Sequence, residues 1–340
     1  MSFNLILNQI LKIMVIKNFA VLGYGNIGAI HLQNLMKHPK TEVKAVYSRS
    51  HKANLPKGIN FYNSYEKLIE KEEIDAVLIA TPTFTHEKIA CFCAENGLDI
   101  FLEKPMALTL DECDNIINTV ETNNVKFFIG HVLRFWPSYR YVRDFIISLK
   151  SNLGDIHTFI AKRLSSFPWS EWFADEKKSG GVILDLSIHD LDYASWILGN
   201  VISISCKAKK IKRFDRKVFG KSNTTLTFQD DKKAKCTASW AEKKDFTFTT
   251  YGNIIGTRGK IEFNGERIFE GYSVEIIEKL KSDDGYYNEL SHFIDCIINR
   301  YKNLSIVGED GKNSVALCLA AIESANNNGK IIFLDEYLNY

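Results

Sequence analysis

The sequence lacks the features that would tie it to a membrane, to nucleic acid or to a metal. Its 340 residues contain no apolar run near the ~20 residues that a membrane-spanning helix requires. The formal net charge is only +2, with acids and bases mixed, so a nucleic-acid partner is not expected. The seven cysteines are scattered and form no C-x-x-C pair, so neither a zinc clasp nor a disulfide framework is indicated. We therefore expect no metal, free thiols and a cytoplasmic location.

The length of the chain exceeds what one hydrophobic core usually serves, so two domains are expected. We place them at residues 15–131 and 132–340. Residues 1–13, "MSFNLILNQILKI", are apolar but lack a basic leader and a small-residue cleavage site. A signal peptide is therefore not expected, and this segment has no assigned role.

The first domain alternates short apolar runs with amphipathic stretches of helical length. The runs are apolar on both faces, as strands of a helix-covered parallel sheet must be. Strands are predicted at 18–23, 42–48, 75–81, 98–103 and 126–130. Helices are predicted at 26–37, 64–72, 84–96 and 109–123. This β-α-β array predicts an α/β fold with a doubly wound Rossmann sheet.

The second domain shows a different pattern, in which apolar and polar residues alternate. This period of two is typical of an antiparallel sheet with one face in water. The alternating apolar residues are Ile202, Ile204, Cys206 and Ala208, then Ala234, Cys236, Ala238 and Trp240, then Phe246 and Phe248. Helical patterns return near 286–300 and 312–327, and a short strand is predicted at 331–334.

Three glycines follow the first predicted strand in G-x-G-x-x-G spacing. Gly23 would form the tight turn, Gly25 would let the backbone approach a pyrophosphate, and Gly28 would let helix pack on strand. Asn26 and Ile27 would start the helix whose free N–H groups bind the phosphates. The alternative is an ordinary glycine-rich turn, but the position within a β-α-β array favours dinucleotide binding.

The end of the second predicted strand bears on the choice of cofactor. An NAD-binding domain usually places an acid there for the ribose hydroxyls, and this segment, "VYSRS", has none. Ser48 and Arg49 could instead bind a 2′-phosphate. We therefore predict NADP in preference to NAD, the alternative being that Arg49 is a solvated loop residue.

Further polar residues follow the next two strands, at the sheet edge where ligands of open α/β sheets bind. They are Thr81, Pro82 and His86 after one strand, and Glu103, Lys104 and Pro105 after the other. Pro105 keeps Lys104 extended, so the amine stays at the rim of the cofactor crevice. There it could donate a hydrogen bond to a carbinol or join proton transfer. The alternative is a Glu–Lys surface pair of little consequence.

A second concentration of polar groups lies in "KSGGVILDLSIHDLDYASWILG", residues 178–199. Asp185 and His189 are four residues apart and should share one face of an apolar helix, with Asp192 nearby. Histidine suits general acid/base chemistry near neutral pH. Two alternatives stay open: a structural Asp–His hydrogen bond, or metal ligation by His189, Asp190 and Asp192.

Taken in order, these motifs resemble those of the Gfo/Idh/MocA oxidoreductases. The pattern comprises the glycine turn with His31, T-P-T-x-x-H at 81–86, E-K-P at 103–105 and G-G-x-x-x-D-x-x-x-H at 180–189, and the resemblance spans roughly residues 17–335. It implies a second domain with a large, open, mainly antiparallel sheet that forms a homodimer or homotetramer interface. It also implies that Lys104 assists at the reacting carbon, His189 exchanges the hydroxyl proton and Asp185 positions the substrate. The loops containing Thr81, Pro82, His86 and Glu103 would contact the cofactor.

The resemblance implies an NAD(P)-dependent enzyme that interconverts a secondary hydroxyl and a ketone, or an aldose and its lactone. The expected substrate is a sugar, polyol or sugar derivative. Candidate walls of its pocket are Arg134, Trp136, Arg163, Trp172 and Tyr287. One alternative is an NAD-dependent glycosidase that acts by oxidation and elimination, and the other is a non-catalytic nucleotide-binding regulator.

Overall fold

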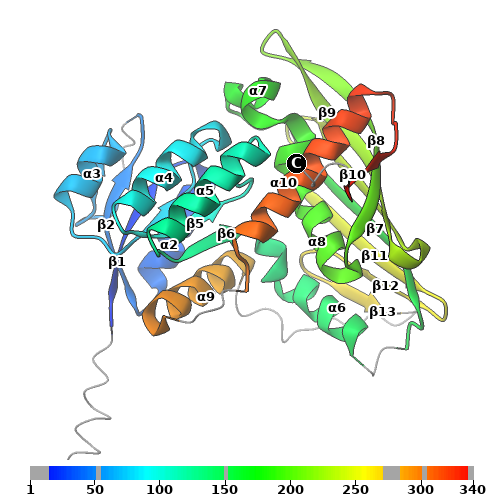
Figure 1. Cartoon of the computed structure of the whole chain (residues 1–340), viewed down its shortest axis with the longest axis horizontal. Coiled ribbons are helices and arrows are strands. Elements are labelled where there is room, and N and C mark those ends of the chain that lie inside the picture. Colours follow the sequence, from blue (N-terminus) through cyan, green and yellow to red (C-terminus); the bar gives the residue numbers. More distant parts are fainter. Residues whose placement is uncertain (1–14, 51–54, 149–151, 271–283, 301–304, 336–340) are drawn as a thin grey trace, which may run out of the picture.

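The computed structural model describes residues 15–50, 55–148, 152–270, 284–300 and 305–335. These residues form two β-sheets with helices packed around and between them (Figure 1). The N-terminal extension, residues 1–13, lies outside the described residues. In the described part of the chain, no helix combines the length and apolar character needed to cross a bilayer.

The first sheet is a six-stranded parallel sheet in the order β3-β2-β1-β4-β5-β6. Its strands are β1 (Lys17–Leu22), β2 (Thr41–Tyr47), β3 (Asn60–Tyr62), β4 (Ala76–Ile79), β5 (Asp99–Glu103) and β6 (Phe127–Gly130). The five predicted strands are confirmed, and only the three-residue β3 was not predicted. The strand order reverses between β1 and β4, which creates the crevice where such sheets bind nucleotides.

The predicted helices of this first half are also confirmed. They are α2 (Asn26–Lys37), α3 (Tyr65–Lys71), α4 (His86–Glu95) and α5 (Leu110–Thr122), with a 3-10 turn η1 (Thr83–Thr85) before α4. The α5 helix begins with a capping box, in which the Thr109 hydroxyl accepts the N–H of Glu112 and the Glu112 carboxylate accepts the N–H of Thr109.

One helix from late in the chain returns to the first sheet. This helix, α9 (Gly285–Asn299), lies beside the sheet in Figure 1. Its Phe293 ring packs edge-on against Phe19 of β1 and Phe101 of β5, with centroids 6.3 and 5.8 Å apart. Lys40, after α2, pairs with Asp295 of α9 at 2.7 Å. The first sheet is therefore covered in part by a helix that follows the second sheet in sequence.

The second sheet has eight strands in the order β13-β12-β11-β7-β10-β9-β8-β14. They are β7 (Ile156–Ser166), β8 (Val201–Arg213), β9 (Arg216–Phe228), β10 (Lys233–Glu242), β11 (Thr249–Gly256), β12 (Lys260–Phe263), β13 (Ile268–Glu270) and β14 (Ile332–Phe333). All neighbours are antiparallel except β7 and β10. The predicted mainly antiparallel sheet is thus confirmed.

The predicted alternation fails at one place. Phe246 and Phe248 lie in the loop between β10 and β11, where the N–H of Phe246 closes a turn on the carbonyl of Lys243. The Phe248 side chain is 55% exposed. The two phenylalanines repeat at the period of a strand, but the turn at residues 243–246 ends the pairing before they are reached.

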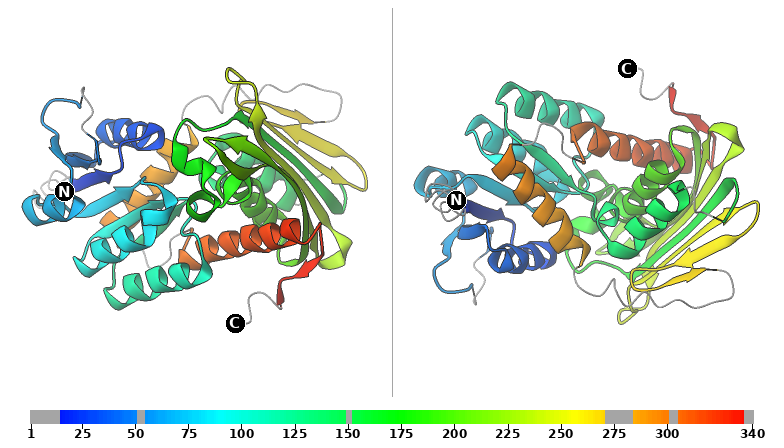
Figure 2. Two further views of the ribbon diagram at one scale, coloured as in Figure 1. Left: turned by 90° about the horizontal axis from the view of Figure 1, so that it is seen from above. Right: turned by 90° about the horizontal axis from the view of Figure 1, so that it is seen from below.

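Three of the remaining helices lie against one face of the second sheet, as Figure 2 shows: α6 (Pro137–Ile147), α8 (Ile188–Leu198) and α10 (Gly308–Asn326). The short elements are α7 (Glu176–Ser179), η2 (Val132–Arg134), η3 (Glu171–Ala174) and η5 (Gln229–Asp231), and η5 forms the turn between β9 and β10. A π-helical segment, η4 (Ile183–Ser187), leads into α8. The α10 helix contacts α5 and β6 on one side and β8 on the other, so it joins the two sheets. No described helix covers the opposite face.

Candidate active site

The glycine turn has the geometry that its spacing predicts. Gly23 has φ +105°, and a side chain there would collide with the backbone of Ala80 and Thr81. Gly28 packs directly against the carbonyl of Gly23, whereas nothing lies within 4 Å of the place where a Cβ of Gly25 would stand. The α2 helix starts with no side-chain cap and no acid in its first turn. Its N–H groups near Asn26 and Ile27 are thus suited to a pyrophosphate.

The loop after β2 lies beside this turn. The carbonyl of Tyr47 accepts the N–H of Gly23 at 2.9 Å, and the N–H of Ser48 donates to the carbonyl of Tyr62. Arg49 is exposed, and the loop continues into residues outside the described part of the chain. Ser48 and Arg49 therefore flank the turn at the position where a dinucleotide's adenosine ribose is expected.

His86 connects the loops that follow β4 and β5. Its Nε2 lies 2.9 Å from the carbonyl oxygen of Thr81, and its Nδ1 lies 2.8 Å from that of Pro105. Burial lowers the pKa of His86, whereas the two carbonyl acceptors raise it, and a neutral ring could donate to only one of them. Pro82 caps the η1 turn in this loop. The role of His86 in the structure is to hold the two loops together at the edge of the crevice.

Lys104 extends from the end of β5 to the second half of the chain. Its Nζ donates to the backbone carbonyl of Asp185 at 2.8 Å and to the Asp185 carboxylate at 3.3 Å. The two side chains are only 15% and 17% exposed. The peptide bond that joins Lys104 to Pro105 is cis. An amine from the end of the first sheet and a carboxylate from the helix beside the second sheet are thus in direct contact.

Asp185 lies in the π-helical segment, a detail that the sequence did not reveal. The predicted helix is present, but its hydrogen bonding widens over residues 183–187 before regular α-helix resumes at Ile188. Single π-turns inside helices occur frequently at functional sites. Here the widened turn contains both oxygen atoms that accept from Lys104.

His189 stands one turn further along the same helix, with its side chain partly exposed and its Nδ1 buried. Nδ1 has no hydrogen-bond partner among the described residues. Burial lowers the pKa of His189 well below its ordinary value, and the nearby positive charge of Lys104 lowers it further. The lowered pKa favours the neutral imidazole, which keeps one ring nitrogen with a free lone pair.

Two arginines predicted to contact substrate form buried ion pairs instead. Arg163 donates two hydrogen bonds to Asp190, at 2.8 and 3.1 Å, and both side chains are almost fully buried. Arg134 pairs in the same bidentate way with Asp192 and also reaches Asp310 at 2.9 Å. Their guanidinium groups are held by carboxylates of the protein, so a role in substrate binding stays a prediction.

The aromatic candidates lie in different places. Trp172, in η3, packs on Phe84 of the T-P-T loop with ring centroids 6.0 Å apart, which places it between the two halves of the chain. Trp136 donates its indole N–H to the carbonyl of Gly265. Tyr287 lies beside His38, at the opposite end of α2 from the glycine turn, and is not brought to Lys104.

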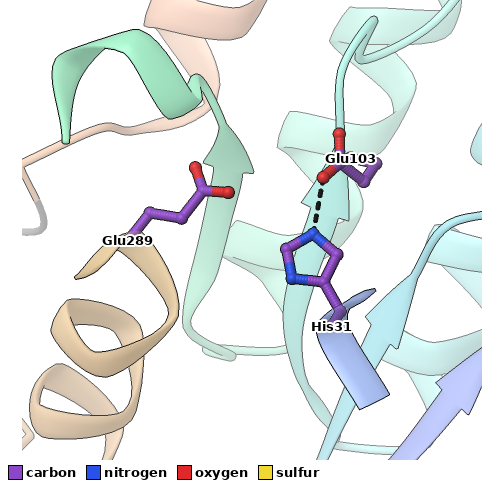
Figure 3. Close-up of side chains that lie close together, drawn as sticks. All are labelled: His31, Glu103 and Glu289. Atoms are coloured by element: carbon purple, nitrogen blue, oxygen red, sulfur yellow. Dashed lines mark hydrogen bonds and ion pairs between the residues drawn. The ribbon is translucent and has the colours of Figure 1, made fainter. Parts of the chain in front are cut away.

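A buried cluster lies behind Lys104, in which Glu103 and His31 belong to the predicted motifs and Glu289 was not predicted. His31 Nε2 lies 2.6 Å from Glu103 Oε1, and Glu289 of α9 faces this pair, as Figure 3 shows. Ligand atoms of the three residues lie within 4.8 Å of one another. Glu289 interrupts an apolar helical face that includes Phe293, which is the one signal that could have drawn attention to it.

Comparison with family profiles gives two consecutive matches. The profile described as "Oxidoreductase family, NAD-binding Rossmann fold" matches residues 17–131. The profile described as "GFO/IDH/MocA C-terminal domain" matches residues 139–262. The two matches together span most of the chain and occur in the order of the two sheets.

Individual proteins show the same likeness. The scyllo-inositol 2-dehydrogenase (NAD(+)) of Bacillus subtilis is 29% identical over 330 residues, covering 91% of this chain and 94% of the relative. A 2,7-anhydro-N-acetylneuraminate hydratase of Mediterraneibacter gnavus is 28% identical over 54% of this chain and 50% of the relative. Among solved structures, GenD2 from gentamicin A biosynthesis, in complex with NAD, has a TM-score of 0.82 at 18% identity, covering 94% of this chain and 97% of GenD2.

Proposed function

Because the chain belongs to the Gfo/Idh/MocA oxidoreductase family, we propose that it interconverts a secondary hydroxyl and a ketone on a sugar or polyol. One observation carries this proposal. Lys104, at the edge of the nucleotide-binding sheet, contacts Asp185, and its charge acts on the neutral His189 one turn along the same helix. This arrangement supports a role for Lys104 as a cationic hydrogen-bond donor and for His189 as a base on the neighbouring helix.

The residues divide the chemistry as follows. NAD(P), when bound on the glycine turn, supplies the hydride acceptor or donor. During oxidation, His189 accepts the proton of the substrate hydroxyl, since its imidazole is neutral. Lys104 donates a hydrogen bond to the same oxygen and stabilises its developing negative charge. Asp185 anchors the ammonium group and so fixes its distance from the substrate.

The substrate class rests on the relatives and on the chemistry of the site. The B. subtilis relative is named for a cyclic polyol and matches nearly the whole chain. Trp172 stands at the boundary of the two halves, and an aromatic ring there suits the apolar face of a sugar ring. We propose that an inositol or a comparable polyhydroxylated ring is bound beside Lys104.

Oxidation followed by elimination is the second candidate. The M. gnavus relative is named a hydratase, which indicates that members of this group catalyse more than simple dehydrogenation. The same base and cation would serve such a cycle, because its first step is again removal of a hydroxyl proton. The two functions differ in outcome: the cycle returns the cofactor to its starting redox state.

The choice between NADP and NAD is a separate proposal. The absence of an acid at 47–50 and the exposed Arg49 support room for a 2′-phosphate. The comparisons do not support this preference, since the B. subtilis relative is named for NAD(+). If Arg49 binds the phosphate, Arg49→Ala lowers kcat/KM for NADP⁺ by about tenfold or more and leaves that for NAD⁺ unchanged. Equal changes for both cofactors would contradict the proposal.

We also propose a two-domain organisation with the junction near residue 131, and self-association through the open face of the second sheet. The path of the chain supports the junction, since β6 ends at Gly130 and the next strand, β7, belongs to the other sheet.

The proposed interface is supported by the face of the second sheet that no described helix covers, because a sheet of eight strands offers a large continuous surface there.

A substrate panel tests the proposed activity directly. Cyclic polyols, sugars and sugar nucleotides are offered with NAD⁺ and with NADP⁺, and the nicotinamide absorbance is followed. We expect turnover of at least one secondary alcohol and a loss of about 10²–10⁴-fold in Lys104→Met. Product release without net absorbance change would favour the oxidation–elimination cycle. Cofactor binding without any turnover would instead favour a non-catalytic regulator.

A further inference from the structure

Glu289 is a carboxyl group buried in the interior on α9. Its residue is 0% exposed, and neither carboxylate oxygen has a hydrogen-bond partner among the described residues. A buried carboxylate without a partner is strongly unfavourable, so the group must hold either a proton or a cation. The neighbouring residues determine which of the two it holds.

A metal ion fits the cluster poorly. His31 Nε2 and Glu103 Oε1 are 2.6 Å apart, the distance of a direct charge-assisted hydrogen bond. Two ligand atoms of one zinc ion, each about 2.0–2.2 Å from it, stand farther apart than this in tetrahedral geometry. The His31–Glu103 contact therefore already holds a proton. The carboxyl group of Glu289 faces this pair (Figure 3), and its ligand oxygen lies within 4.8 Å of those of His31 and Glu103.

We propose that Glu289 is a positioning residue which, as a neutral carboxylic acid, orients Glu103 and through it Lys104. This inference rests on the proposed function, because it takes Lys104 to be the group that contacts substrate. The structure has the two carboxyl groups within 4.8 Å of each other without a hydrogen bond between them, and in the proposed state the Glu289 hydroxyl turns to donate to the Glu103 carboxylate. Neither Glu289 nor His31 touches the substrate in this arrangement.

The connection from Glu103 to Lys104 is short. Glu103 Oε1 contacts His31, and Glu103 Oε2 accepts the backbone N–H of Lys104 at 3.2 Å. Rotation of this carboxylate would break one contact or the other and move the start of the Lys104 side chain. A displacement of even about 1 Å at a catalytic group can cost 10²-fold in rate, so a second support behind Glu103 matters.

The electrostatic surroundings favour the neutral acid. Burial raises the pKa of Glu289 well above its ordinary value, and the negative charges of Glu103 and Asp284 raise it further. The titratable groups that face the cluster are His31 from α2, Glu103 and Lys104 from β5 and the loop after it, Asp284 and Tyr286 from the start of α9, His86 from the start of α4, His131 after β6 and Arg163 from β7, which Asp190 holds. Arg134, on η2 beside α9, is held by Asp192 and Asp310 and offers no cation to the cluster.

Ionisation of Glu289 would therefore lower the activity at alkaline pH. Above its pKa, two carboxylates would repel each other behind Lys104, and kcat would fall while KM for the cofactor stayed nearly constant. The variant Glu289→Gln keeps a neutral hydrogen-bond donor of the same shape. We expect it to retain kcat within about threefold at neutral pH and to lack the alkaline limb that Glu289 causes.

The pH profile is measured for the wild type, Glu289→Gln, Glu289→Ala and the surface control Glu121→Gln. Glu289→Ala removes the donor, and we expect kcat to fall about 10–100-fold. If Glu289→Gln keeps the alkaline limb of the wild type, or loses more than tenfold in kcat at neutral pH, the proposal is overturned. Should the alanine variant fail to fold, the glutamine variant alone decides.

Two measurements need no substrate and separate this inference from the proposed function. First, the free energy of unfolding of the wild type should fall relative to that of Glu289→Gln as the pH rises from the pKa of Glu289 in the unfolded state toward its higher pKa in the folded state. The reason is that folded protein still holds the Glu289 proton in this range, whereas unfolded protein has released it. Second, the NMR signal of ¹³C-dimethylated Lys104, assigned by its absence in Lys104→Met, should shift as Glu289 titrates in the wild type only.

If these two effects appear but no alcohol is turned over, the proposed function fails and the coupling of Glu289 to Lys104 stands. If turnover is found but neither effect appears, the inference fails alone. Metal analysis gives a further decisive outcome. One equivalent of divalent metal in the wild type, absent from Glu289→Gln, would overturn the neutral acid in favour of a metal site.

Discussion

Asp185 and Asp190 lie five residues apart on one helical segment, and each pairs with a cation from another element. Asp190 receives two hydrogen bonds from Arg163, and the pair is almost completely buried. Asp185 receives one longer contact from Lys104, and both side chains keep some exposure. Asp192, further along, resembles Asp190, since Arg134 holds it in bidentate geometry.

The two pairs differ in the number of hydrogen-bond donors that remain unused and in their access to solvent. The guanidinium of Arg163 is fixed by its partner in a buried setting, so it stabilises the packing of the helix on the sheet. Lys104 has three N–H donors and gives two of them to Asp185. One donor and some solvent access remain, which is what a substrate oxygen requires. The two pairs therefore differ in unused hydrogen-bond capacity rather than in the presence of charge.

The largest effect should come from the base beside Lys104. We expect His189→Asn to lower kcat for alcohol oxidation by about 10²–10⁴-fold, because the hydroxyl proton loses its acceptor. The matched control is His157→Asn, which alters an exposed histidine on β7. Steady-state kinetics with the substrate found in the panel provide the measurement. Near-wild-type turnover in His189→Asn would contradict the proposal that the surroundings of the Lys104–Asp185 pair, and not those of the Arg163–Asp190 pair, carry the chemistry.

The buried pair should dominate stability. Asp190→Ala leaves Arg163 buried without its counter-ion, and we expect a loss of about 3–5 kcal/mol in the free energy of unfolding. Lys104→Met, at the more accessible pair, should cost less, because both side chains keep some contact with solvent. Urea denaturation measures both. The double variant Arg163→Met/Asp190→Leu should recover much of the loss, and equal costs at the two pairs would contradict the comparison.

The charge of Lys104 should be visible in the titration of His189. Burial and the lysine together lower the pKa of His189, so removing the positive charge in Lys104→Met should raise it, while burial keeps it below about 6.5. NMR of isotope-labelled histidine follows the titration without substrate. Lys104→Arg preserves the charge and should leave the pKa unchanged. A downward shift in Lys104→Met would show that the amine is not beside the imidazole.

The smallest effect concerns charges that have no partner of opposite sign. Five exposed lysines lie on β8, β9 and β10, and none forms an ion pair among the described residues: Lys207, Lys209, Lys221, Lys233 and Lys235. Two copies associating through this face would bring like charges together. Raising salt from about 0.05 M to about 0.5 M should therefore strengthen association by tenfold or less. Analytical ultracentrifugation measures this, and weaker association at high salt would exclude that geometry.

The sequence predicted the fold well because each element has a strong local signal. The strands of the first sheet are apolar on both faces, and the glycine turn and the Thr109 capping box mark where helices begin. The second sheet is revealed by alternation. That same signal misled at Phe246 and Phe248, since two alternating residues do not specify pairing, and a turn at Lys243 ends the strand first.

The site was predicted less completely because its geometry depends on contacts far apart in sequence. The motifs identified Lys104, Asp185 and His189, and the structure brings Lys104 and Asp185 together. No local sequence pattern indicates that Arg163 pairs with Asp190. Likewise, none indicates that Glu289 lies beside the pair of His31 and Glu103. Neither does spacing reveal the π-turn, which depends on packing rather than on residue preference.

The return of α9 to the first sheet has a consequence for how this protein can be cut and recombined. A fragment ending at residue 131 would expose the faces of Phe19 and Phe101 that Phe293 covers, and would lose the salt link from Lys40 to Asp295. We therefore do not expect the nucleotide-binding half to fold stably without α9. Gene fusions or chimeras that exchange it must carry the late helix along, or supply a substitute for it.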